Sequence, residues 1–395
     1  MSKANPILSI LIPTFNRKNT INLTLSVLLK QIIDSGLQES VEVYVGDNCS
    51  TDGTGEYLMD LSKSYDSFFK YKINNENLGS VRNLLSLVDL AVGKYWMFYG
   101  DDDFVPEKSL ISIVECLNLN SSMPVFMFKQ HIKNRNVSFK DYTNENILSI
   151  NELAQDYFYY IGNAGVFAVN REISQSAIKL KFESLLDTCW PQTDIVFLTA
   201  HLCTENKNIF ASTISSVNSS IGGLFFMNSD YFFETMLYSL IRSAISVDSE
   251  IQNNFIKNAM KSIYGIIFFV SFKIEVIEHY VFFDLKNEKE HFEKSVSNSM
   301  KRIPIEFGKE IRSIASLVNM PIWYLKLWLY IKYFKRTIKL PINATFLNRL
   351  KIYSPYGYKA MIIERQNSKN EFYKMKNKKI ITSNSGYFHK EICAE

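Results

Sequence analysis

The sequence predicts an α/β fold in which a mostly parallel sheet is flanked by helices. Two patterns in the first hundred residues lead to this class: short apolar runs bounded by glycine, proline or polar turns, and apolar residues at helical spacing between them. Strands that alternate with helices form parallel sheets covered on both faces. The strands are predicted at 7–12, 41–45, 71–73 and 95–99, and the helices at 20–33, from about 54, and at 80–91.

The first strand and helix illustrate how each element is predicted. Residues 7–12 are apolar apart from one serine, and Pro13 closes the run because it cannot donate a hydrogen bond within a sheet. The helix that follows should bury four residues that share one face: Ile21, Leu25, Leu28 and Ile32.

Polar side chains follow three of these strands, at 14–17, 47–50 and 101–103. The carboxyl ends of parallel strands meet at one edge of a sheet, which is where open α/β sheets bind ligands. These loops are therefore candidates to hold a base, a ribose and a metal-bound diphosphate. No Gly-x-Gly-x-x-Gly or Walker motif follows the first strand, so a dinucleotide or P-loop site is not predicted.

Asp101, Asp102 and Asp103 are three adjacent carboxylates that directly follow a buried strand and Gly100. They repel one another, and Mg²⁺ or Mn²⁺ would offset that cost while sharing its ligand shell with phosphate oxygens. A solvated acidic turn is the alternative. Arg82, one turn into its helix, is a candidate to pair with phosphate, and a plain surface arginine is the alternative there.

The bulk properties limit the class of protein. A chain of 395 residues with 47% hydrophobic and 21% charged residues suits a folded protein of two or three domains. Five scattered cysteines without metal-ligand spacing favour a reducing compartment. The apolar run Ile263 to Phe272 is too short to span a bilayer, and no signal peptide is recognised, so a cytoplasmic location is predicted. A net charge of +4 and the lack of a nucleic-acid module predict no nucleic-acid partner.

The middle of the chain adds strands predicted at 125–129 and 165–169, separated by a polar insert over 131–151. An apolar helix is predicted at 195–202, and Asp194 stands at its head. Capping of that helix would explain Asp194 without a catalytic role.

The last part of the chain, 226–395, is predicted to be mainly helical, basic and rich in aromatic residues. No Asp or Glu occurs between Glu310 and Glu364, and 321–351 combines basic with aromatic positions. This pattern is typical of an interfacial helix on anionic lipid, and a buried helix with long lysine stems is the alternative. We expect peripheral association with the inner face of the cell membrane through 321–351.

Four segments stand out by their order and spacing. They are Ser-Ile-Leu-Ile-Pro-Thr-Phe-Asn-Arg (9–17), Val-Gly-Asp-Asn-Cys-Ser-Thr-Asp-Gly-Thr (45–54), Asn-x-Asn-Leu-Gly-x-x-Arg-Asn (75–83) and Gly-Lys-Tyr-Trp-Met-Phe-Tyr-Gly-Asp-Asp-Asp (93–103). Together they resemble family 2 nucleotide-sugar glycosyltransferases, which have the GT-A fold. The resemblance covers roughly residues 7–115 well and extends loosely to about 205.

This resemblance implies a GT-A domain over 1–225, with a nucleotide-sugar half at 1–115 and an acceptor half at 116–225, followed by 226–395. It implies metal-dependent transfer of a sugar from a nucleoside diphosphate to a glycan acceptor, with Mg²⁺ or Mn²⁺ as cofactor. A nucleotidyltransferase and a non-catalytic binding subunit with the same fold are the alternatives. The sequence leaves open the sugar, the linkage, the stereochemistry and the formation of homo-oligomers.

The resemblance also implies roles for individual residues. Asp101 and Asp103 would bind the metal, and the short spacing to Pro106 makes Asp102 the alternative ligand. Asp194 would be the general base, although Thr193 replaces the glutamate that the family usually has there. The nucleotide-sugar site would comprise Pro13, Thr14, Asn16, Arg17, Asp47, Asn48, Asn77, Arg82, Asp101 and Asp102.

Asn48 stands where many relatives have a second aspartate. A carboxylate accepts a hydrogen bond from the imide of uracil, whereas an amide both donates and accepts and so also suits cytosine. UDP- and CDP-sugars are therefore the predicted donors, and abequosyltransferases, which use CDP-sugars, are broadly similar. With a membrane-facing C-terminal region, we expect an acceptor linked to undecaprenyl diphosphate, as in O-antigen and other bacterial surface glycans.

Overall fold

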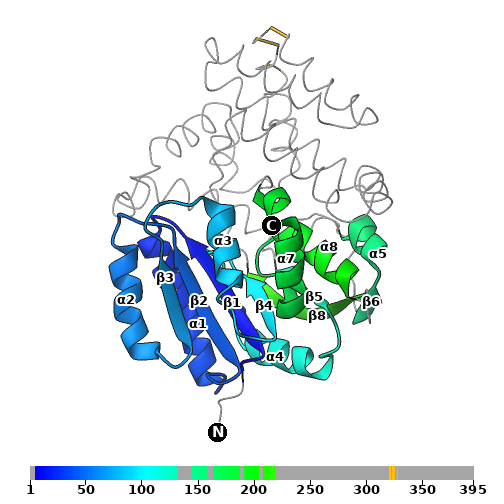
Figure 1. Ribbon diagram of the computed structural model, residues 1–395, viewed down its shortest axis with the longest axis horizontal. Coiled ribbons are helices and arrows are strands. Elements are labelled where there is room, and N and C mark those ends of the chain that lie inside the picture. Colours follow the sequence, from blue (N-terminus) through cyan, green and yellow to red (C-terminus); the bar gives the residue numbers. More distant parts are fainter. Residues whose placement is uncertain are drawn as a thin grey trace, which may run out of the picture. The chain divides into compact units, whose positions relative to one another are not determined.

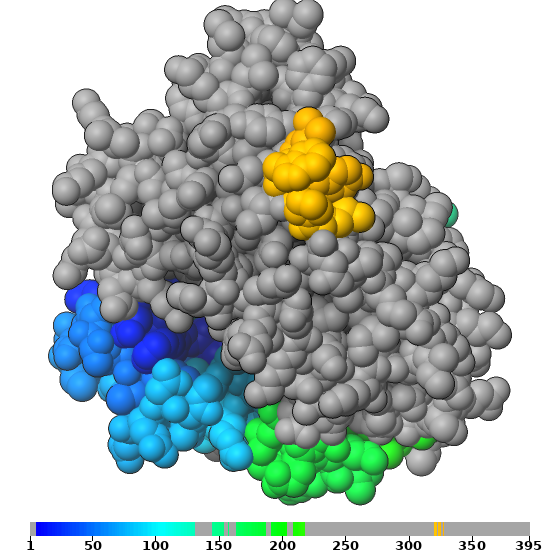
Figure 2. Space-filling view, turned by 90° about the horizontal axis from the view of Figure 1, so that it is seen from above, coloured from blue at the N-terminus to red at the C-terminus, as the bar shows by residue number. Residues whose placement is uncertain are grey.

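The computed structural model describes residues 5–131, 144–157, 163–186, 191–203, 208–218, 320, 321, 323, 324 and 327. The described residues up to 218 belong to one compact unit and those of 320–327 to a second. In the second unit, Trp323, Tyr324 and Leu327 have exposed side chains, and this short segment is orange in Figure 2. The predicted helical character of most of 226–395 lies outside the described residues.

The described part of the first unit contains an eight-stranded sheet in the order β3-β2-β1-β4-β7-β5-β8-β6. The pairs β1–β2, β2–β3, β1–β4 and β5–β8 are parallel, whereas β7 is antiparallel to β4 and β5, and β6 to β8. The predicted mostly parallel α/β sheet is thus confirmed. The strands are β1 (Leu8–Thr14), β2 (Val41–Asp47), β3 (Phe69–Ile73), β4 (Tyr95–Phe98), β5 (Val125–His131), β6 (Asn146–Leu148), β7 (Phe167–Asn170) and β8 (Ile209–Asn218).

Helices flank this sheet, as Figure 1 shows. Of these, α3 packs on β1 and β2 and against α7, and α7 in turn packs against α8. The four residues predicted on the inner face of the first helix are all buried in α1, together with Thr24 and Leu29. The helices are α1 (Lys18–Asp34), α2 (Thr54–Tyr65), α3 (Ser80–Val88), α4 (Ser109–Leu119), α5 (Ile150–Asp156), α7 (Arg171–Leu186) and α8 (Pro191–Leu202).

Strands β1 and β2, which lead into the site, run further at their carboxyl ends than the sequence predicts. Strand β1 continues through Pro13 to Thr14, because its pairing with β4 ends at Leu11 while its pairing with β2 continues. A proline is tolerated where a strand has a neighbour on one side only. Strand β2 likewise extends to Asp47, so this carboxylate is the last residue of a strand rather than part of the loop.

Strand β4 anchors the sheet through large aromatic side chains. Tyr95, Trp96 and Tyr99 are at most 1% exposed. The indole N–H of Trp96 donates to Ser174 Oγ at 2.8 Å, and the hydroxyl of Tyr99 donates to the carbonyl of Ser216 at 2.6 Å. Each buried aromatic contributes roughly 1.5–3 kcal/mol, so the strand that leads into the three aspartates is firmly held.

Candidate functional site

The carboxyl ends of β1, β2 and β4 meet at one edge of the sheet, as the strand order predicts. Thr14 connects all three: it stands opposite Asp47 in the sheet, and its carbonyl accepts a hydrogen bond from the N–H of Asn48 at 3.0 Å. Its hydroxyl donates to Asp101 Oδ2 at 2.7 Å. The polar segments that follow three separate strands therefore form one site.

Asp101 is held by residues of the first strand and helix. Its Oδ1 accepts from Arg17 Nη1 at 2.7 Å and its Oδ2 from Thr14, while its carbonyl accepts from the hydroxyl of Thr24 at 2.9 Å. Burial raises the pKa of the Asp101 carboxyl, and the charge of Asp102 adds to this rise. The Arg17 guanidinium and the Thr14 hydroxyl act in the opposite direction. Both carboxylate oxygens of Asp101 are thus already used within the protein.

Asp102 and Asp103 both lie close to Gly100. Asp103 is buried and accepts a hydrogen bond from the Gly100 N–H at 3.2 Å, whereas Asp102 is partly exposed and lies 3.4 Å from Arg17. A Cβ added to Gly100 would lie 2.7 Å from Asp103 Oδ2 and 3.1 Å from Asp102 Oδ1. Oxygens of both carboxylates therefore lie near the same point, and only glycine leaves room for them there.

Whether this site can hold a divalent ion depends on the carboxylates that it brings together. Within the described ranges, no group of three or more His, Cys, Asp or Glu side chains is arranged to hold a metal by itself. Mg²⁺ and Mn²⁺ are commonly bound by one or two carboxylates together with substrate phosphates. The pair Asp102 and Asp103 fits that arrangement. Asp101, predicted with Asp103 as a ligand, is paired with Arg17 in the structure, and its role as a metal ligand stays a prediction.

Asp47 is fully buried at the end of β2. Its Oδ1 accepts hydrogen bonds from the N–H and the hydroxyl of Ser50, whereas its Oδ2 has no hydrogen-bond partner. Burial raises the pKa of Asp47, Ser50 opposes this, and the charges of Asp52 and Glu56 reinforce it. A buried carboxylate oxygen without a partner is costly, which makes it a candidate to accept a hydrogen bond from a ligand.

The first two loops are joined to one another. Asn16 adopts a left-handed conformation with φ 53°, and its Oδ1 accepts from the N–H of Thr51 at 2.8 Å. Its own N–H donates to the hydroxyl of Ser50 at 2.8 Å. Asparagine tolerates this conformation better than most residues, so Asn16 shapes the loop that carries Arg17.

Asn48 and Asn77, both predicted at the nucleotide-sugar site, are in contact: Asn48 Nδ2 donates to Asn77 Oδ1 at 2.7 Å. Two further asparagines have no role in the sequence-based site: Asn74 donates to Asn48 and also to Asn83. Asn83 could have been noticed, because it is a polar residue on the apolar face of a helix.

Arg82 is exposed on α3, and its guanidinium carbon lies 6.0 Å from the ring centroid of Phe182 in α7. This arrangement matches the alternative of a surface arginine. Its pairing with a diphosphate stays a prediction.

Asp194 is the fourth residue of α8 and is 3% exposed. It therefore lies within the first turn of the helix, where its charge interacts favourably with the helix dipole. Helix α8 is buried on all sides from Pro191 to Ala200, and it packs on β7, the neighbour of β4. Its role as a base stays a prediction.

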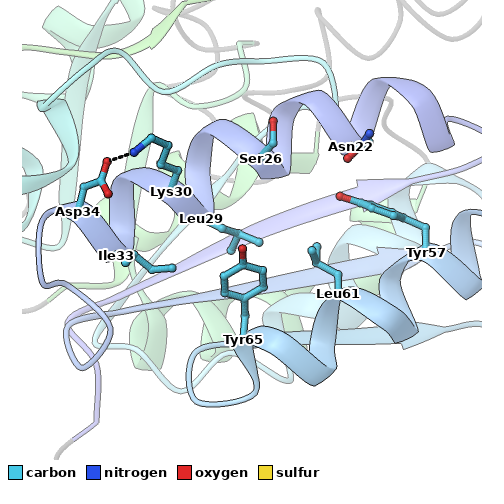
Figure 3. Close-up of a pocket in the computed structure, with 9 residues that line it drawn as sticks. All are labelled: Asn22, Ser26, Leu29, Lys30, Ile33, Asp34, Tyr57, Leu61 and Tyr65. Carbon is cyan, nitrogen blue, oxygen red and sulfur yellow. Dashed lines mark hydrogen bonds and ion pairs between the residues drawn. The ribbon is translucent and has the colours of Figure 1, made fainter.

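A cavity of about 410 Å³ lies elsewhere, between α1 and α2 (Figure 3). Tyr57 and Tyr65 from α2 face Asn22 and Leu29 from α1 across it. It shares no residue with the predicted site, and nothing in the structure indicates a ligand for it.

Parts of this chain are similar to known proteins. Residues 9–177 match the model of glycosyl transferase family 2. The abequosyltransferase RfbV of Salmonella typhimurium is 36% identical over 104 residues, which is 26% of this chain and 30% of that protein. The GalNAc(5)-diNAcBac-PP-undecaprenol beta-1,3-glucosyltransferase of Campylobacter jejuni is 31% identical over 114 residues, 29% of this chain and 35% of that protein. The matches thus span about a third of these curated relatives.

Solved structures agree on the fold. The crystal structure of TarS from S. aureus has a TM-score of 0.53 at 13% identity, covering 78% of this chain and 52% of that one. TarS 1–349 in complex with UDP-GlcNAc has a TM-score of 0.51 at 16% identity, covering 75% of this chain and 81% of that one. The predicted GT-A fold is confirmed, and residues 9–177 are similar to glycosyl transferase family 2.

Proposed function

We propose that this protein is a glycosyltransferase that moves a sugar from a nucleoside diphosphate to a glycan acceptor in bacterial surface-glycan synthesis. The family 2 domain and the two glycosyltransferases among its relatives support this. The main observation behind this proposal is that the polar segments after three strands meet at one edge of the sheet. Thr14 donates a hydrogen bond to Asp101, which also pairs with Arg17, and the carbonyl of Thr14 accepts from the N–H of Asn48. Carboxylates that could hold a metal, the guanidinium of Arg17 and a cluster of asparagine amides are groups suited to binding a nucleoside-diphosphate sugar.

In this proposal, Asp102 and Asp103 hold Mg²⁺ or Mn²⁺, and Asp101 orients Arg17. When bound, the ion neutralises charge on the departing diphosphate. Arg17 adds a second positive charge, fixed in direction by its 2.7 Å contact with Asp101. Thr14 and Asn16 shape the surrounding loop, and Asp47 Oδ2 and the Asn48 amide face the nucleoside, with UDP and CDP as the candidate leaving groups.

Asp194 is our proposed general base, which takes the proton of the acceptor hydroxyl in an inverting transfer. Its place on α8, which packs on the strand beside β4, supports this role. An Asp194→Asn variant should lose most turnover while its affinity for the donor nucleotide stays the same. Unchanged turnover would leave Asp194 with only its role in the first turn of the helix.

We propose an acceptor linked to a lipid diphosphate, and association of 321–351 with an anionic membrane. The exposed edge-to-face pair Trp323 and Tyr324, together with exposed Leu327, supports an interfacial surface. The name of the Campylobacter relative contains such a lipid carrier. In the described ranges, none of the helices is long and apolar enough to cross a membrane.

Sedimentation with liposomes tests the membrane association. The protein should sediment with anionic vesicles and not with neutral ones, and salt should weaken binding. Reversing the charges of Lys332, Lys335 and Arg336 should release it, whereas reversing exposed Lys30 and Lys63 should not. Equal binding to neutral vesicles would contradict the proposal.

Titration calorimetry with UDP, CDP, GDP and dTDP, with and without Mn²⁺, tests the donor site. We expect one nucleotide to bind at least tenfold more tightly than the others, and only with the metal. Asp103→Asn should abolish the effect of the metal, whereas Asp89→Asn, at an exposed carboxylate after α3, should not. If none of the four nucleotides binds with or without metal, the proposed function is wrong.

A further inference from the structure

Four asparagines form a continuous hydrogen-bonded chain behind the proposed nucleoside site. Asn74 Nδ2 donates to Asn48 Oδ1 at 3.1 Å and to Asn83 Oδ1 at 3.0 Å, and Asn48 Nδ2 donates to Asn77 Oδ1 at 2.7 Å. Asn48, Asn74 and Asn83 are between 1% and 6% exposed. Asn48 directly follows β2, Asn74 directly follows β3, and Asn83 lies in helix α3.

Backbone groups fix the orientation of these amides. The N–H of Leu78 donates to Asn48 Oδ1 and the N–H of Gly79 to Asn77 Oδ1, both at 2.9 Å. At the other end, Asn83 Nδ2 donates to the carbonyl of Gly46 at 2.8 Å. A backbone N–H can only donate and a backbone carbonyl can only accept, so the oxygen and nitrogen of each of these three amides are assigned without ambiguity.

Asn74 links the two ends of the chain, because one of its N–H groups donates to Asn48 and the other to Asn83. These contacts limit the hydrogen bonds that Asn48 can make with a ligand. Its oxygen accepts from Asn74 and Leu78, which fills both lone pairs, and one of its two N–H groups is taken by Asn77. One N–H is the hydrogen-bonding capacity that remains for a ligand.

We infer that Asn74 and Asn83 are positioning residues that make Asn48 a hydrogen-bond donor only, and thereby set the base preference of the donor site. The inference rests on the proposed function. An asparagine side chain that is not fixed by hydrogen bonds can turn either its oxygen or its nitrogen toward a base. Because the hydrogen bonds of the chain fix Asn48, it favours a nucleoside diphosphate whose base places an acceptor next to its remaining N–H. Such an acceptor is a carbonyl oxygen or a ring nitrogen without hydrogen. A base that presents an N–H at that position is disfavoured because two donors would face each other.

Gly46 also helps to hold the asparagine chain in place. A Cβ at this position would lie 2.8 Å from Asn83 Oδ1 and 3.0 Å from Leu87 Cδ2. The glycine therefore lets Asn83 approach the backbone of β2 closely enough to be anchored there. Asn83 does not reach the nucleoside in this arrangement and acts through Asn74 and Asn48.

The test compares Asn74→Ala with Asn75→Ala. Asn74 carries both hydrogen bonds of the chain, whereas Asn75 is its exposed neighbour, whose side chain has none in the structure. The dissociation constants of UDP, CDP, GDP and dTDP are measured with Mn²⁺ for both variants and the wild type. For Asn74→Ala we expect the preferred nucleotide to bind about tenfold more weakly, or 1.4 kcal/mol, with a smaller change for the others. Asn75→Ala should leave all four constants unchanged.

The ratios among the four dissociation constants distinguish a positioning role of Asn74 from a role in the stability of the fold alone. If Asn74→Ala lowers the melting temperature but keeps the ratios among the four nucleotides, the inference is wrong, and it is also wrong if the wild type shows no preference. If the wild type binds none of them, the proposed function itself has failed. Should Asn74→Ala not fold, Asn74→Ser keeps a polar group but is too short for both partners, and the same loss of preference is expected.

Discussion

The pairing of Arg17 with Asp101 leads to a quantitative prediction about stability. The two residues are 84 positions apart and meet at 2.7 Å, with side-chain exposures of 30% and 9%. Arg17→Met keeps the apolar stem and removes the charge, whereas Asp101→Asn removes the carboxylate charge and keeps the size. The double variant completes a thermodynamic cycle that isolates the interaction between the two residues.

The expected magnitudes follow from burial. Arg17→Met leaves a buried carboxylate with Thr14 as its remaining side-chain donor, and we expect a loss of roughly 2–3 kcal/mol in the free energy of unfolding. Asp101→Asn leaves the Arg17 cation with Asp102 at 3.4 Å and able to reach water, and we expect a loss of about 1–2 kcal/mol. The double variant should cost no more than Arg17→Met, which corresponds to a coupling of about 1–2 kcal/mol.

Urea unfolding of the full-length protein, with EDTA and without nucleotide, measures these values from midpoints at constant slope. Lys30→Met is the matched control, because Lys30 forms an exposed ion pair with Asp34 one helical turn away. It should cost at most about 0.5 kcal/mol. If the Arg17 and Asp101 variants are additive within about 0.5 kcal/mol, the pair does not couple the two loops and Asp101 is available to a metal.

Three further predictions concern the same edge of the sheet and the strand beside it. Asp103→Asn should weaken Mn²⁺ binding in the presence of nucleotide at least tenfold, and Asp101→Asn by clearly less; calorimetry would contradict this if the order were reversed. Burial raises the pKa of Asp47 above 3.8, so its ionisation disfavours the folded state as the pH rises through that range, and the melting temperature of Asp47→Asn relative to the wild type should increase from pH 4 to pH 7. A constant difference would refute this. Gly93→Ala should lower the melting temperature more than Gly46→Ala, since its Cβ would meet the backbone nitrogen of Ser9 at 2.7 Å rather than side chains that can shift; equal losses would contradict it.

The apolar patterns predicted the first half of the sheet because each element there is locally consistent. Strand β1 and helix α1 alternate and repeat as a parallel unit requires, and all four residues predicted on the inner face of the helix are buried. The rule that parallel strands end at one edge then brought Thr14, Asp47 and Asp101 together without any contact being known.

The second half could not be ordered in this way. Strand β7 inserts between β4 and β5 and runs antiparallel to both, although it follows β5 in the chain. Nothing in the alternation of its residues encodes which edge it joins. The sequence also could not predict the pairing of Arg17 with Asp101, because three adjacent aspartates form the same sequence pattern whether the first of them binds a metal or an arginine.

One member of the asparagine chain, Asn83, could have been recognised from the sequence. Asn83 lies between apolar residues on the buried face of α3, and a buried polar side chain must be satisfied by a partner. That argument indicates a hydrogen bond but does not name its partner, which is the carbonyl of Gly46 on another strand. Asn74 carries no comparable signal, since it stands in a polar loop.

The contacts of Arg17 show how the aspartates at the end of β4 can divide their roles. Arg17 Nη1 lies 2.7 Å from Asp101 and 3.4 Å from Asp102, so one guanidinium interacts with two of the three carboxylates. In the proposed function, a divalent cation at Asp102 and Asp103 would further offset the negative charge of the triplet. A single aspartate could not serve the arginine and the cation equally well, whereas three adjacent carboxylates can. The proposed cation and Arg17 would then both act on one diphosphate.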